Sequence, residues 1–217
     1  MMSKRRLLRG SYQNIIDIYD ETSVTTKYQG SHWYEIANSM ANIIGYNILT
    51  THFDILDWET AGVIGAGVIS ALSPQTSWDR NVENASTFSH TLDKPTFCTE
   101  REFAKALKIV ESLKSGELSV DKVLEILGPQ AWKTKPFFMN ILNPKGDYGP
   151  TIDRHAIAVY LKAVPSPIQL GRGTRAEGNI QIQRSYLMAS KKLDKHYNEV
   201  QATTWLAWRA RHARGEE

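Results

Sequence analysis

Apolar residues recur along most of the chain with the three- or four-residue spacing of an amphipathic helix. Runs in which apolar and polar residues alternate, which would predict strands, are nearly absent. We therefore predict an all-α protein of about ten helices, forming a single domain with the option of two lobes. The expected helices span residues 11–19, 31–46, 58–72, 78–91, 100–114, 120–127, 135–142, 154–162, 179–193 and 198–212.

The spacing of these helices also predicts how the chain is organised. Residues 1–30 are expected to form a basic N-terminal segment with the first helix, and residues 31–217 the main helical domain. Helices within residues 179–213 are expected to pack back on that domain. Prolines and glycines make residues 165–178 the longest segment predicted to be irregular, either a mobile binding element or a plain connector.

Three glycines within residues 62–67 have a spacing like that of a dinucleotide-binding loop. Here, however, they lie inside a helical apolar pattern, and no strand precedes them. Together with the alanines of the same stretch, they predict a helix face that another helix approaches closely.

The composition is that of an ordinary globular protein. The chain has 217 residues, 41% of them hydrophobic and 23% charged, enough for one sizeable core or two small ones. A net charge of +3 permits a nucleic-acid partner without requiring one. Basic residues gather near both ends, where they are expected to be solvated or to contact phosphate: Lys4, Arg5, Arg6, Arg9, Arg209, Arg211, His212 and Arg214.

Cysteine and histidine usage argues against several kinds of site. Cys98 is the only cysteine, so neither an intramolecular disulfide nor a cysteine metal cage can form, and a reducing, cytoplasmic location is expected. The six histidines show no metal-binding spacing, and no serine lies in a Gly-x-Ser-x-Gly frame. We expect no metal and no cofactor. No apolar run is long enough for a signal peptide or a membrane span.

Residues 71–85 predict a helix-loop-helix corner, in which an apolar helix ends, the chain turns at Ser73-Pro74, and Ser77 caps the next helix. The loop exposes Gln75, whose side chain can both donate and accept hydrogen bonds and therefore suits base edges or the gap left by a displaced base. Trp78 could stack on a nucleobase or belong to the core.

Residues 151–155 place Asp153 directly before an apolar helical pattern, as an N-terminal cap held by free backbone amides. The plain interpretation is a structural cap. Arg154 and His155 could contact phosphate or orient the carboxylate, although a structural hydrogen bond is the simpler role for the histidine. Lysines lie upstream at positions 133 and 135, next to aromatic residues.

Three motifs in order resemble the helix-hairpin-helix (HhH-GPD, endonuclease III-like) DNA glycosylase superfamily. They are Leu-Ser-Pro-Gln-Thr at residues 72–76, Lys-Thr at 133–134 and Ile-Asp-Arg-His at 152–155. More closely, residues 73–81, 137–141 and 199–205 resemble uncharacterised glycosylase-like proteins of phages. Related phage clades have been proposed to process hypermodified thymine.

The resemblance implies a role for individual residues. Asp153 matches the catalytic aspartate, and Lys133 matches the lysine of bifunctional members. Lys135 is an alternative, because its distance to the aspartate is 153 − 135 = 18 residues, against 153 − 133 = 20 for Lys133. Gln75 matches the residue pushed toward the DNA stack. The further expected contacts to substrate or DNA are Ser73, Trp78, Asn140, Arg154 and His155.

The chain departs from the family at the hairpin. The family reads Leu-Pro-Gly-Val-Gly before its Lys-Thr step, whereas residues 127–132 here read Leu-Gly-Pro-Gln-Ala-Trp. Two glycines that let backbone amides approach a phosphate are therefore absent.

Physical chemistry supports the same roles. Breaking an N-glycosidic bond creates positive charge on the sugar, which an ionised carboxylate stabilises. A lysine desolvated among aromatic residues has a lowered pKa and can attack as a neutral amine, forming a Schiff base. We expect a DNA N-glycosylase, with or without lyase activity, acting on a damaged or modified base flipped from duplex DNA. Two alternatives are a phage enzyme that hypermodifies an activated thymine derivative and a noncatalytic module that binds DNA or a host protein.

Overall fold

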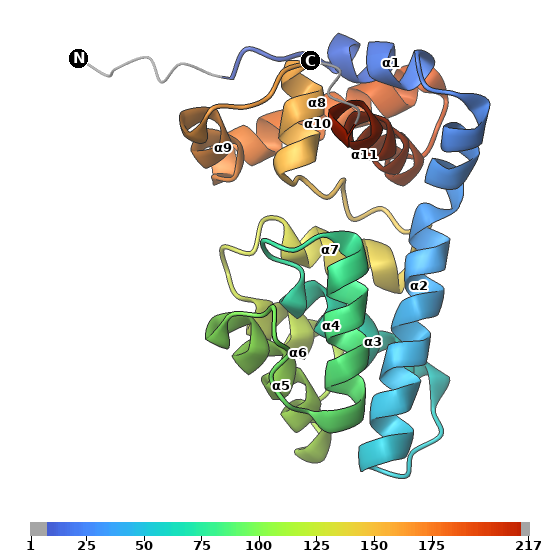
Figure 1. Ribbon diagram of the computed structural model, residues 1–217, viewed down its shortest axis with the longest axis vertical. Coiled ribbons are helices and arrows are strands. Elements are labelled where there is room, and N and C mark those ends of the chain that lie inside the picture. The colour runs from blue at the N-terminus through green and yellow to red at the C-terminus, as the bar shows by residue number, and fades with distance from the viewer. Residues whose placement is uncertain (1–7, 214–217) are drawn as a thin grey trace. The chain divides into compact units, whose positions relative to one another are not determined.

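The computed structural model describes residues 8–213 and shows eleven helices and no strand in that range (Figure 1). The prediction of an all-α protein is confirmed. The helices are α1 (Tyr12–Asp20), α2 (Val24–His52), α3 (Trp58–Leu72), α4 (Trp78–Thr91), α5 (Glu100–Lys114), α6 (Val120–Leu127), α7 (Thr134–Leu142), α8 (Arg154–Leu161), α9 (Pro167–Gly173), α10 (Ala176–Leu193) and α11 (Tyr197–Ala213).

The chain divides into two compact units, which we describe separately. The first joins residues 1–34 to residues 147–217, and the second comprises residues 35–146. Helix α2 contributes residues 24–34 to the first unit and residues 35–52 to the second.

In the first unit, α1 packs against α8, α10 and α11, and α9 packs against α8 and α10. The core forms because each of these helices turns an apolar stripe inward. Its fully buried side chains include Ile15 and Ile18 of α1, Ile157 of α8, Tyr186 of α10 and Val200 of α11.

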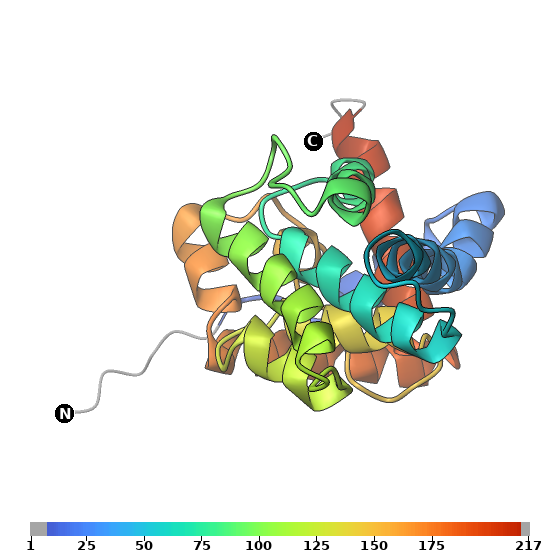
Figure 2. The same cartoon turned by 90° about the horizontal axis from the view of Figure 1, so that it is seen from below.

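Helix α3 is the centre of the second unit and contacts α4, α5, α6 and α7. Eleven of its fifteen residues are buried, which fits its nearly unbroken apolar sequence. A Cβ atom on Gly65 would lie only 1.8 Å from the carbonyl oxygen of Ala41 in α2. The glycines of α3 thus allow close helix packing, as the sequence predicted. Around this centre, α5 and α6 lie side by side (Figure 2).

Helix α2 is much longer than predicted, because it runs through Gly30 instead of beginning after it. Glycine weakens a helix, so the sequence pattern predicts a start at the next residue. A Cβ atom on Gly30 would lie 2.1 Å from Oγ1 of Thr203 on α11. The glycine therefore serves tight helix packing within the first unit and does not break the helix.

The segment predicted to be irregular, residues 165–178, is mostly helical. It contains α9 and the first residues of α10. Ser166 caps α9 through a capping box with Gln169, and Pro167 occupies the first helical position. These helix-start signals are present in the sequence, but the frequent glycines and prolines of the segment favour irregular structure and outweighed them in the prediction.

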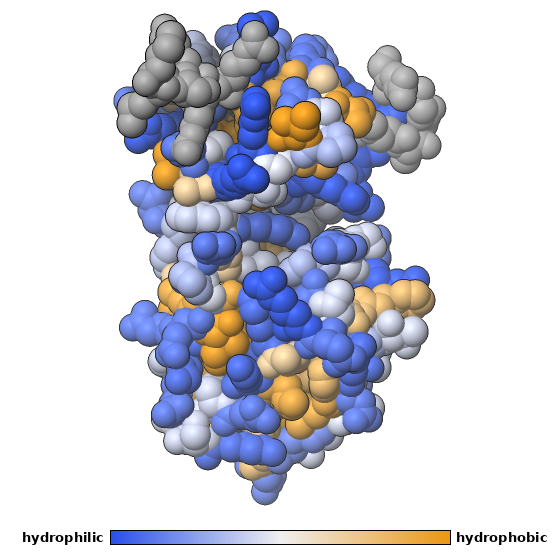
Figure 3. Space-filling view, turned by 90° about the vertical axis from the view of Figure 1, so that its left-hand side faces the viewer, coloured by the Kyte–Doolittle hydropathy of each residue, from blue (hydrophilic) through white to orange (hydrophobic). Residues whose placement is uncertain are grey.

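Among the described residues, no helix is both long and apolar enough to cross a membrane. On the face drawn in Figure 3, hydrophobic residues form separate patches among hydrophilic ones. Of the terminal basic residues, Lys4, Arg5, Arg6, Arg214 and the His212 side chain lie outside what the structure describes.

Candidate functional site

Asp153 of the first unit is the N-cap of α8, as the sequence predicted. Its Oδ1 atom accepts hydrogen bonds from the backbone N–H groups of His155, at 2.9 Å, and Ala156, at 2.8 Å. The other carboxylate oxygen, Oδ2, accepts no hydrogen bond from a described residue. The half-buried side chain is thus fixed in direction by one oxygen, while the second has no hydrogen-bond partner among the described residues.

A second aspartate N-cap shows how this arrangement differs from a purely structural one. Asp57 caps α3 with both oxygens: Oδ1 accepts from the N–H of Glu59 at 3.2 Å, and Oδ2 from the N–H of Thr60 at 3.3 Å. The hydroxyl of Thr60 also donates to Oδ2. Both oxygens of Asp57 are therefore used by the helix itself.

Buried hydroxyl groups lie in the electrostatic neighbourhood of Asp153. The Tyr34 hydroxyl donates to Oε1 of Gln201 at 2.9 Å and is 3.1 Å from the hydroxyl oxygen of Thr151. Tyr186 pairs with the Thr204 hydroxyl at 3.4 Å. Burial raises the pKa of both tyrosines well above the usual value, and the negative charge of Asp153 acts in the same direction. Both therefore remain neutral hydrogen-bond donors.

Neither tyrosine was predicted as a site residue from the sequence. Tyr34 is far from Asp153 in the chain, and a tyrosine on an amphipathic helix is expected to be an ordinary core residue. Thr151 belongs to the motif at residues 151–155, and Gln201 and Thr204 belong to the block at residues 199–205, but none of the three was predicted as a site residue.

His155 belongs to an aromatic cluster. Its ring meets Trp205 edge to face, with 6.2 Å between centroids, and Trp205 in turn meets Trp33 at 5.6 Å. The guanidinium of Arg209 lies 4.6 Å from the Trp205 ring. The neighbouring Arg154 is exposed and reaches the His155 ring nitrogen at 3.4 Å.

In the second unit, Lys133 stands directly before α7. Its amine donates a hydrogen bond to the backbone carbonyl of Ser73 at 3.1 Å and lies 5.9 Å from the centre of the Phe137 ring. Two of the predicted motifs, the Lys-Thr step and the Ser-Pro-Gln-Thr turn, are therefore in contact. Lys135 is also half-buried, but its amine makes no hydrogen bond or ion pair with a described residue.

The turn beside this contact carries Gln75, which is exposed and has a φ angle of +58°. Residues other than glycine rarely adopt this left-handed conformation, and they are found disproportionately at functional sites. Trp78 is half-buried and packs edge to face on Phe137 at 6.3 Å. Asn140 is fully buried.

The predicted site residues thus fall into two groups. Asp153, Arg154 and His155 belong to the first unit, and Ser73, Gln75, Trp78, Lys133, Lys135 and Asn140 belong to the second. Within the described part of the chain, no group of three or more histidine, cysteine, aspartate or glutamate side chains could hold a metal ion.

The fold of the described residues defines the protein only as all-helical. The chain belongs to DUF7178, a family of unknown function, whose model matches residues 1–212. No curated protein and no solved structure matches the chain.

Proposed function

We propose that the protein is a DNA N-glycosylase-like enzyme that cleaves the N-glycosidic bond of a damaged or modified base flipped from duplex DNA. The observation that supports this most is the geometry of Asp153. Both of its capping hydrogen bonds fall on Oδ1, so that a partly buried carboxylate presents Oδ2 to a ligand. Asp57 differs in this respect, because both of its oxygens accept hydrogen bonds from the helix that it caps.

The reaction needs such a carboxylate. When the bond between the anomeric carbon and the base breaks, the base leaves with the electron pair and positive charge develops on the sugar. The negative charge of Asp153 stabilises that cation, and a preorganised charge needs no rearrangement during the reaction. Water then adds to the anomeric carbon and loses a proton, which leaves an abasic site and the free base.

Lys133 would give the enzyme its second activity. A neutral amine attacks the anomeric carbon in place of water, and the base leaves with the electron pair of the broken bond. The sugar ring then opens: its oxygen takes up a proton and becomes a hydroxyl, and the amine nitrogen forms the Schiff base with the anomeric carbon. The hydrogen bond to the Ser73 carbonyl oxygen positions the amine at the start of α7. This bond uses an N–H group of the amine, so the nitrogen lone pair stays available for attack. Lys135, which lacks a comparable tether, is the alternative nucleophile.

Gln75 supports the proposal from the side of DNA opening. A base that leaves the duplex leaves a gap, which a polar side chain with donor and acceptor groups can fill. An exposed glutamine in a left-handed turn suits this role, because residues in such strained conformations are found disproportionately at functional sites.

The proposal is tested by incubating the protein with DNA that contains modified or damaged bases and measuring the products by mass spectrometry. We expect a free base and a matching number of abasic sites. A chemically altered nucleotide with no released base would instead indicate a hypermodification enzyme. DNA that is bound but unchanged would indicate a noncatalytic module.

A further inference from the structure

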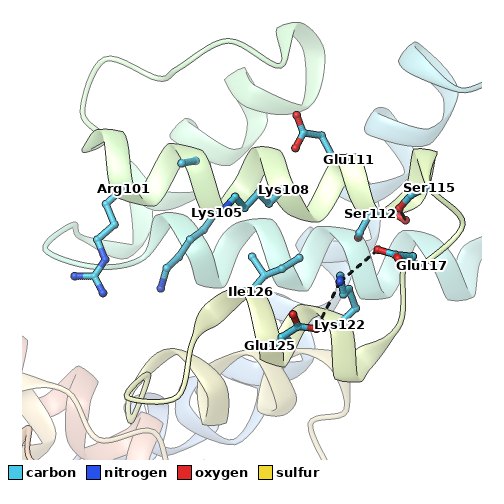
Figure 4. Close-up of a pocket in the computed structure, with 11 residues that line it drawn as sticks. Arg101, Lys105, Lys108, Glu111, Ser112, Ser115, Glu117, Lys122, Glu125 and Ile126 are labelled. Carbon is cyan, nitrogen blue, oxygen red and sulfur yellow. Dashed lines mark hydrogen bonds and ion pairs between the residues drawn. The ribbon is translucent and has the colours of Figure 1, made fainter.

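A groove of about 700 Å³ lies between α5 and α6 of the second unit, outside the predicted site residues (Figure 4). Three cationic side chains of α5 line it: Arg101, Lys105 and Lys108. Their spacing of four and then three residues places them on one face of the helix, separated along its axis by about 6 Å and about 4.5 Å. In Figure 4, Arg101 and Lys105 extend to the same side of α5, whereas Glu111 extends the other way.

The positive charge at this end of the groove is only partly compensated by the protein. Arg101 and Lys108 are exposed, and neither forms an ion pair with a described residue. Burial lowers the pKa of Lys105, and the neighbouring Arg101 guanidinium acts in the same direction, whereas the carboxylate of Glu102 acts against them. A bound anion would relieve this repulsion.

The other end of the groove is different. Lys122 is held between Glu117, at 3.3 Å, and Glu125, at 3.5 Å (Figure 4). These two carboxylates more than balance the lysine and would repel an anion. Any anionic ligand is therefore confined to the basic end, beside Arg101 and Lys105.

Lys105 connects the basic end to the hairpin between α6 and α7. Its amine donates a hydrogen bond to the carbonyl oxygen of Leu127, the last residue of α6. The hairpin turn begins at the next residue, Gly128, whose φ angle is +100°. An anion bound by the α5 cations would thus lie close to this turn.

We propose that Arg101, Lys105 and Lys108 bind consecutive backbone phosphates of a nucleic-acid strand; this rests on the proposed function, in which DNA is the substrate. A nucleic-acid backbone presents regularly spaced charges that a row of cations on one helix can match. Ala104 and Ile126 are the only apolar residues of the lining, and every other lining residue is charged or a serine, which favours a charged ligand. The contact is independent of base sequence.

The test measures the affinity of the full-length protein for an unmodified DNA duplex over a range of salt concentrations. The variant is Arg101→Gln with Lys108→Gln, which keeps Lys105 and its bond to the hairpin. The control is Lys191→Gln with Lys192→Gln, which removes the same charge from exposed positions of α10. Thermal unfolding by circular dichroism verifies that each variant is folded.

We expect the slope of log affinity against log salt to fall in magnitude by about 2 in the groove variant, since each lost phosphate contact contributes about 0.9. The control should keep the wild-type slope. Equal slopes in both variants would overturn the groove assignment while leaving base release untouched. If the groove variant shows the lower slope but the wild-type protein releases no base from modified DNA, the glycosylase proposal is overturned and the groove assignment stands. Wild-type binding without salt dependence would overturn the groove assignment outright.

Discussion

The amine of Lys133 donates a hydrogen bond to the backbone carbonyl oxygen of Ser73, 3.1 Å away, although 60 residues separate them in the sequence. This bond joins the start of α7 to the turn that carries Gln75. Two motifs that the sequence could only order along the chain are thereby neighbours within the second unit. The chemistry of the lysine and the conformation of the turn can each be tested.

Lys133→Ala should abolish covalent trapping of an abasic-site duplex by borohydride, because the trapped species is the reduced Schiff base of this amine. Lys133→Arg should do the same, although it retains a positive charge and hydrogen-bond donors. The adduct is measured by gel electrophoresis. Lys135→Ala serves as the control and should trap normally. Trapping that survives in Lys133→Ala but disappears in Lys135→Ala would reassign the nucleophile.

Gln75→Gly should leave the protein as stable as the wild type or up to about 1 kcal/mol more stable, because glycine adopts a positive φ angle without steric strain. Base release from a paired base should nevertheless fall, since nothing fills the gap in the duplex. Both quantities are measured, by denaturant unfolding and by a base-release assay. Asp54→Gly, at another exposed position with a φ angle of 56°, is the matched control and should keep full activity. Unchanged activity in Gln75→Gly would exclude the side chain from base displacement.

Gly30→Ala should strongly destabilise the protein, because the added methyl group would meet Thr203 at 2.1 Å from Oγ1 and 2.6 Å from Cα. A backbone atom cannot yield as a flexible side chain can. Gly171→Ala, at a helical position with nothing within 4 Å of the added carbon, should raise stability by about 0.5–1 kcal/mol. Thermal unfolding of both variants checks this contrast. A Gly30→Ala variant as stable as the wild type would refute the close contact between α2 and α11.

Burial of Tyr34 predicts a loss of stability at alkaline pH. Its pKa is raised in the folded state, so its stabilising contribution is complete below the unfolded value of about 10 and is lost as the pH rises toward the folded value. Tyr34→Phe should therefore reduce the alkaline slope of the unfolding free energy by up to about 1.4 kcal/mol per pH unit. Chemical denaturation at several pH values measures this slope.

The same variant has an expected effect at neutral pH. Tyr34→Phe deprives the buried Gln201 of a hydrogen-bond donor, which should cost about 1–3 kcal/mol. Tyr28→Phe, at an exposed position, is the control and should leave stability at pH 7 near that of the wild type. If Tyr34→Phe does not change the alkaline slope, the pKa of Tyr34 is the same in the folded and unfolded states, which would contradict the prediction.

Much of the fold could be predicted from the sequence because its signals are local. The limits of α3 to α6 follow from apolar periodicity and from capping residues such as Ser77, Thr99 and Ser119, and the structure has them at the predicted residues. The full length of α2 could not be predicted, because Gly30 is explained only by Thr203, more than 170 residues later. Its role depends on tertiary contact.

The candidate site shows the same division. The position of Asp153 as an N-cap was predictable, because a capping side chain bonds to the next few backbone amides. The sequence could not predict which oxygen of Asp153 accepts those bonds. Nor could it predict that the hydroxyl of Tyr34 is buried nearby, since both features depend on packing between distant helices. The contact of Lys133 with Ser73 likewise requires the three-dimensional arrangement of α3 and α7.

The most direct test of the central claim compares two aspartate caps. Asp153→Asn retains an oxygen that accepts the hydrogen bonds from His155 and Ala156, and asparagine is as good an N-cap as aspartate, so the fold should be preserved. The negative charge that stabilises the sugar cation is lost. Asp57→Asn makes the same chemical change at a cap whose two oxygens are already engaged.

The measurement is the rate of base release from duplex DNA by the wild type and these two variants under single-turnover conditions. The account predicts that Asp153→Asn, with thermal unfolding like that of the wild type, releases base at least about a hundred-fold more slowly, whereas Asp57→Asn keeps the wild-type rate. Equal rates in the folded Asp153→Asn variant and the wild type, or no base release by the wild type from any modified DNA, would contradict it.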